Sequence, residues 1–70
     1  MANRTYFAHI ISNTSEDRIY TISHRSAMKA AAQYGRCEQG ESVTIRTFSG
    51  QTLSKVLWDS QSRKYINVTA

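Results

Sequence analysis

Residues 23–40 read S-H-R-S-A-M-K-A-A-A-Q-Y-G-R-C-E-Q-G, and this stretch decides the fold because it alone has a helical pattern. It is rich in alanine and other good helix formers and contains no β-branched residue. Its apolar residues recur at the spacing of one helical face, a stripe made of Ala27, Ala30, Ala31 and Tyr34. Ser23 is placed to cap the helix, with Ser26 adding a second local hydrogen bond. Gly35 predicts a helix end in the left-handed conformation.

Strand patterns flank the helix on both sides. Five segments are rich in β-branched and aromatic residues and are bounded by polar turns: residues 5–12, 18–22, 41–48, 52–58 and 64–69. The first has apolar residues on both faces, which favours a central or well covered strand. Ser49-Gly50 is a hairpin signal whose loop length is open, and a slip of one residue would exchange the faces of the next strand. The sequence predicts an α+β fold, with a single helix packed on an antiparallel sheet in the order β-β-α-β-β-β.

Length and composition indicate one small domain spanning residues 1–70. A core of this size is marginal, so a homodimer that covers further apolar surface is one expectation. Cys37 has no second cysteine to pair with, which fits a reducing cytoplasm. No apolar run has the length of a membrane span or a signal peptide, so we expect a cytoplasmic protein without membrane contact. The formal net charge of +4 favours anionic partners such as nucleic acid, nucleotides or an acidic protein patch.

One pattern recurs along the predicted strands, an arginine two residues before an aromatic ring. The pairs are Arg4 and Tyr6, Arg18 and Tyr20, Arg46 and Phe48, and Arg63 and Tyr65. Residues i and i+2 of a strand share a face, so each pair projects together. If the strands align, one sheet face would present arginines to phosphates and rings to bases, as in sheet proteins that bind single strands. The ordinary alternative is that arginine stems simply pack over neighbouring rings.

A second basic surface is predicted on the helix. Arg25 and Lys29 are four residues apart, and Arg36 joins their arc only if the helix continues through Gly35. These residues would form a cationic stripe beside the alanine stripe. The ordinary alternative is a solvated polar face.

No constellation in the sequence predicts catalysis, a metal site or a cofactor. His9, His24 and Cys37 are the soft metal ligands, and no two of them have metal-site spacing. The acidic residues fall in turns or at strand ends, and no pair is placed across a cleft. A phosphate-binding glycine loop is absent. We therefore expect no enzyme.

Residues 26–41, S-A-M-K-A-A-A-Q-Y-G-R-C-E-Q-G-E, are followed by V-T-I-R-T at 43–47 and by L-S-K-V-L-W-D at 53–59. Together these segments resemble short uncharacterised accessory proteins of bacteria and their phages. The resemblance covers about half the chain and carries over no functional residue. It implies a context in which small mobile-element proteins block a host defence complex.

The leading hypothesis is a basic, non-enzymatic module that binds nucleic acid through the arginine–aromatic sheet face or the basic helix stripe. The first alternative is an anti-defence inhibitor that binds a host protein complex, for example a nucleic-acid-handling or CRISPR-type complex. A nucleotide-sequestering protein is the third option and would need a pocket.

Overall fold

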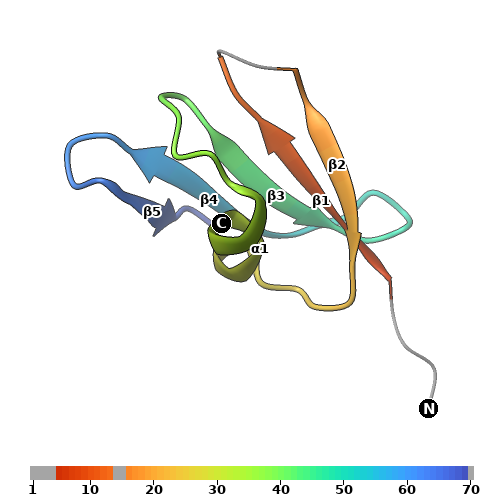
Figure 1. Ribbon diagram of the computed structural model, residues 1–70. Helices are drawn as coiled ribbons and strands as arrows, with labels where there is room; N and C mark the ends of the chain where they lie inside the picture. The colour runs from red at the N-terminus through yellow and green to blue at the C-terminus, as the bar shows by residue number, and fades with distance from the viewer. Residues whose placement is uncertain (1–4, 14–15, 70) are drawn as a thin grey trace.

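The computed structural model describes residues 5–13 and 16–69, and within them it has one helix on one side of one five-stranded sheet (Figure 1). The elements are β1 (Tyr6–Ile11), β2 (Arg18–Ile22), α1 (Ala27–Tyr34), β3 (Ser42–Arg46), β4 (Thr52–Asp59) and β5 (Lys64–Asn67). Every pairing is antiparallel, and the strand order across the sheet is β2-β1-β3-β4-β5. The predicted fold class and element order are confirmed, and β1 is an interior strand.

Helix α1 begins later than its sequence predicts. The N-cap is Ser26, whose Oγ accepts a hydrogen bond from the Lys29 amide at 3.1 Å, so the predicted cap at Ser23 is wrong. The reason lies on β4, where the Ser54 hydroxyl donates to the Arg25 carbonyl at 2.8 Å and accepts from the Ala27 amide at 3.1 Å. These two bonds hold the chain extended before Ala27 and fix the first helical residue.

The end of α1 falls at Gly35, as predicted, but its conformation differs from the prediction. Gly35 has φ −69° and ψ 150°, which is extended and not left-handed. Glycine is required here by close approach, because a Cβ atom would overlap the Tyr65 hydroxyl and the Ala31 carbonyl oxygen. The left-handed residue of this turn is Cys37, at φ 55°.

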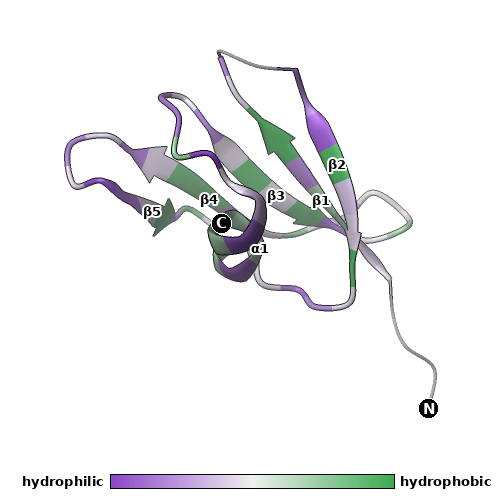
Figure 2. Cartoon of the chain, viewed as in Figure 1, coloured by the Kyte–Doolittle hydropathy of each residue, from purple (hydrophilic) through white to green (hydrophobic). Residues whose placement is uncertain are grey.

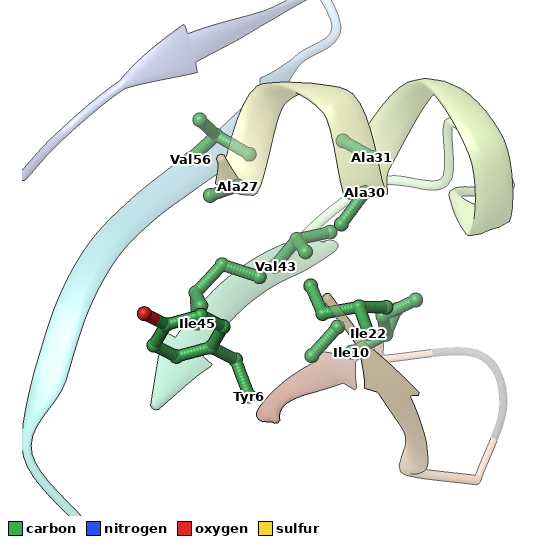
Figure 3. Packing of buried hydrophobic residues seen from close by; sticks show 10 residues of the cluster. Tyr6, Ile10, Ile22, Ala27, Ala30, Ala31, Val43, Ile45 and Val56 are labelled. Atoms are coloured by element: carbon green, nitrogen blue, oxygen red, sulfur yellow. The ribbon is translucent and has the colours of Figure 1, made fainter. Parts of the chain in front are cut away.

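The core lies between α1 and the sheet side that faces it (Figure 3). The helix packs against β3, β4 and β5. Small alanines let its axis approach the sheet, and larger strand residues fill the remaining volume. The buried hydrophobic residues are Tyr6, Ala8, Ile10, Ile22, Ala27, Ala30, Ala31, Val43, Ile45 and Val56.

The opposite side of the sheet has no helix over it in the described part of the chain, and we call it the open side (Figure 1). Hydrophobic residues occur within every strand, and the turn between β4 and β5 is hydrophilic (Figure 2). None of the described helical residues forms a segment long and apolar enough to cross a membrane.

We predict that Ser26→Ala lowers the free energy of unfolding by about 1 kcal/mol, because the Lys29 amide loses its acceptor. Urea unfolding followed by circular dichroism measures the change. Ser23→Ala is the matched control and should leave stability nearly unchanged, since Ser23 is exposed and precedes the cap. An equal loss in both variants would contradict the assignment of the cap.

Candidate functional site

The structure does not bring the four predicted arginine–aromatic pairs onto one sheet face. Three of the rings, Tyr6, Tyr20 and Tyr65, lie on the side covered by α1. Tyr6 belongs to the buried core, and its predicted partner Arg4 lies outside the described residues. The predicted four-pair face is therefore wrong, because the alanine helix leaves space that the tyrosine rings fill.

Arg18 and Tyr20 are held together on the covered side, by contacts with the helix. The Tyr20 ring stacks on the Tyr34 ring of α1 with centroids 4.1 Å apart and an interplanar angle of 7°. Arg18 Nη1 donates to the Tyr34 carbonyl at 3.1 Å and to the Tyr20 hydroxyl at 3.3 Å. These contacts join β2 to the end of α1, so this pair serves packing.

The centre of this arrangement is Glu41, a fully buried carboxylate. It accepts hydrogen bonds from the Arg36 amide at 3.0 and 3.1 Å, from the Cys37 amide at 3.2 Å and from the Tyr65 hydroxyl. Arg18 Nη2 lies 3.6 Å from its Oε2 and supplies the opposite charge. The sequence analysis missed this role, although Glu41 lies two residues before Val43 and so shares the inward face of that segment.

The pair Arg63 and Tyr65 is divided between a turn and a strand. Arg63 lies between β4 and β5 with φ 57°, is exposed, and donates its amide to the Asp59 carbonyl at 2.8 Å. Tyr65 instead points toward Gly35 and Glu41. Burial, followed by the hydrogen bond to Glu41, raises the pKa of the Tyr65 hydroxyl well above its usual range.

The predicted basic helix stripe does not form either. Lys29 lies in α1, but Arg25 precedes the N-cap and Arg36 follows Gly35. All three side chains are exposed. They are therefore separate surface cations, because Ser54 delays the start of the helix and the Tyr65 contact ends it.

The strand register sorts the open side into rows. Residues directly opposite each other in neighbouring strands point to the same side of the sheet. The first row contains Thr21, Phe7 and Arg46; the second, Ile19, His9, Thr44 and Lys55; and the third, Ile11, Ser42, Leu57 and Ile66. We call the third row the aliphatic row. We call Phe7, Arg46 and Phe48 the aromatic end.

The aromatic end contains the one predicted pair that is available on the open side, Arg46 with Phe48. Phe48 is 88% exposed, and its ring centroid lies 6.0 Å from that of Phe7 at an interplanar angle of 41°. Arg46 is exposed directly opposite Phe7. Two rings and a guanidinium group therefore face solvent together.

The turn between β3 and β4 holds Phe48 in place. The Thr47 amide donates to the Gln51 carbonyl at 2.9 Å, and the Gly50 amide donates to the Thr47 carbonyl at 3.0 Å. The Thr47 Oγ1 accepts from the Gln51 amide at 3.1 Å. Gly50 has φ 93°, a conformation that glycine tolerates best. The exposed ring thus stands on a hydrogen-bonded turn.

The second row places Lys55 and His9 beside the aromatic end. Lys55 is exposed on β4, and His9 lies on β1 two residues from Phe7. His9 Nε2 is 3.3 Å from Asp17 Oδ2, an ion pair when the imidazole is protonated. Thr44 is buried between His9 and Lys55.

A shallow hollow of about 380 Å³ lies between the end of β2 and the last two residues of α1. Thr5, Thr21, Ile22, Ser23, His24, Gln33 and Tyr34 line it. His24 Nδ1 accepts a hydrogen bond from the Ser26 amide at 3.2 Å. The lining offers no arginine or lysine for a phosphate, so the hollow gives no support to nucleotide sequestration. The described residues contain no group of three metal-ligating side chains.

No protein-family model, no curated protein and no solved structure matches the chain. The resemblance to phage accessory proteins therefore stays a prediction, and the function is inferred from the chain's own geometry.

We predict that Tyr65→Phe lowers the free energy of unfolding at neutral pH by about 1–3 kcal/mol, because Glu41 loses a hydrogen-bond donor.

Tyr65 also affects how the free energy of unfolding depends on pH. Its pKa is raised on folding, so the unfolded chain loses this proton first and stability falls as pH rises above the ordinary value of 10.0. Urea unfolding across this range should show a shallower fall in Tyr65→Phe than in the native chain. Identical slopes in the two proteins would contradict the assignment.

Proposed function

We propose that this protein is a non-enzymatic binding module that binds single-stranded nucleic acid at the aromatic end of its open side. The observation that carries the proposal is Phe48, an 88% exposed ring on a hydrogen-bonded turn beside Phe7 and Arg46. A large ring is usually buried, so its exposure beside a second ring and an arginine supports an interaction site at this end.

The rings supply base stacking. A base has an apolar face that stacks on an aromatic side chain, and each such contact contributes about 1–3 kcal/mol to binding. Phe7 and Phe48 stand 6.0 Å apart and are tilted to each other, so they offer two separate surfaces. Their ordered backbone reduces the entropy lost on binding.

Arg46 supplies a phosphate contact beside the rings. Arg46 lies directly opposite Phe7 across β1 and β3, so a backbone phosphate can reach it while a base stacks on the ring. The net charge of +4 steers a polyanion toward the protein.

The site favours single strands over duplexes. In a duplex the base faces are already stacked on one another, so exposed protein rings gain nothing without unstacking them. A single strand can present its bases to Phe7 and Phe48 at once. The inhibitor hypothesis needs a host protein that no described residue identifies, and it would become the leading one if nucleic acid failed to bind.

We predict that short labelled single-stranded DNA or RNA binds the protein, with affinity that falls between about 50 and 200 mM salt. Phe48→Ala should weaken binding by about 1–3 kcal/mol through lost stacking. Arg46→Ala should weaken binding and reduce the salt dependence, because one phosphate contact is lost. Fluorescence anisotropy titrations measure both effects.

Two matched controls lie away from the open side. Met28→Ala removes an exposed apolar side chain from α1, and Arg25→Ala removes an exposed arginine before it. Neither should change the affinity by more than about twofold, since surface changes away from a site have small effects. Equal weakening by Arg25→Ala and Arg46→Ala would show that general charge, and not the aromatic end, governs binding.

A further inference from the structure

The aliphatic row exposes large apolar side chains to solvent. It lies at the end of the open side that is farthest from Phe7. Ile11, Leu57 and Ile66 are 37%, 39% and 41% exposed. They come from β1, β4 and β5, and the register aligns them with Ser42 across four neighbouring strands. Neighbouring strands lie about 4.8 Å apart, so the row is about 14 Å long. The row is apolar except for the buried Ser42, and exposed apolar residues aligned in this way are typical of a protein contact.

Strand β4 carries a pattern that is complementary to itself. On its open side it presents Lys55, Leu57 and Asp59, so that an apolar residue lies midway between opposite charges. When such a strand lies antiparallel over its own copy, the lysine of each faces the aspartate of the other. The central leucine then meets its equivalent.

We propose that two copies of this chain pair through their open sides about a two-fold axis that runs along the aliphatic row. Stacked sheets pack about 10 Å apart with roughly aligned strands, and a two-fold interface is formed by the same patch on both subunits. Leu57 packs on the partner's Leu57. Lys55 faces the partner's Asp59, and this ion pair occurs twice.

Asp59 carries the negative charge of this contact. Hydrogen bonds from the Ser62 hydroxyl and the Gln61 amide, with the nearby charge of Lys64, lower the pKa of the Asp59 carboxyl. Asp59 is therefore ionised at neutral pH. Lys64 lies directly beside Asp59 on β5, so Asp59 also has a positive neighbour within its own chain. An experiment must therefore exchange the charges at positions 55 and 59 to separate the contact between copies from this one.

A second copy is the occupant that this surface specifies. Lys55, Leu57 and Asp59 all come from β4, so a second copy supplies the complementary charges and the apolar centre without any other partner. A different protein would have to carry the same charge and apolar pattern at the same spacing. The core of this chain is small, and an apolar contact between copies extends it. The aromatic end stays outside the contact, because Phe7 lies four residues from Ile11, about 13 Å along β1. This inference does not depend on nucleic-acid binding.

Sedimentation equilibrium of the full chain without nucleic acid tests the proposal. We expect twice the 7.9 kDa chain mass, with dissociation on dilution. Leu57→Lys should raise the dissociation constant about tenfold or more, as for a residue at an interface centre. Met28→Lys is the matched control, since Met28 is 44% exposed on α1, and it should leave the dimer unchanged.

A charge exchange tests the register and does not depend on Leu57. Lys55→Asp and Asp59→Lys should each weaken the dimer about tenfold, because each places like charges face to face twice. The double variant should recover the native constant to within about threefold. A monomer at every concentration would overturn the proposal, as would a dimer that Leu57→Lys leaves intact. Failure of the double variant to recover would overturn the two-fold register. Circular dichroism confirms that each variant folds.

Discussion

The buried carboxylate of Glu41 is the interaction on which the rest of the structure depends. It joins the turn after α1 to β2 and β5 through the Arg36 and Cys37 amides, the Tyr65 hydroxyl and the Arg18 guanidinium. A charge without water around it is stable only when nearly all of its hydrogen-bonding capacity is used, so these groups must arrive together. The close approach of Tyr65 in turn demands glycine at position 35. The end of α1, the position of the edge strand β5 and the burial of the Glu41 carboxylate therefore depend on one another.

The order of elements and the interior position of β1 could be predicted because they depend on local patterns: alanine-rich helix, alternating strands and turn residues. The first residue of the helix could not be predicted, because the hydroxyl group that fixes it belongs to Ser54, far along the chain. The distribution of the aromatic rings between the two sides of the sheet also could not be predicted, because it depends on strand register. An Arg-x-Tyr pair shares a face in any strand, but only the pairing of β1 with β2 shows that Tyr20 joins the helix side. Glu41 carried a usable signal in its alternation with Val43 and Ile45.

The two sides of the sheet differ in what determines their residues. The covered side is set by packing against α1 and by the Glu41 network, which together account for all four tyrosines and for Arg18. The open side has no such partner within the described chain, so its rings, cations and aliphatic residues are sorted only by register. Rings with Arg46 collect at one end and aliphatic residues at the other. One face can therefore carry two separate contacts.

This division of the sheet has an evolutionary consequence. A substitution on the open side removes few core contacts and costs little folding free energy, whereas one on the covered side disturbs close packing or a buried charge. Selection can then change the displayed residues quickly while holding the inner ones fixed. Distant descendants of such a chain would share a glycine, a glutamate and a tyrosine in register, yet differ at most positions that meet a partner. Their common ancestry would survive in the hidden half of the strands.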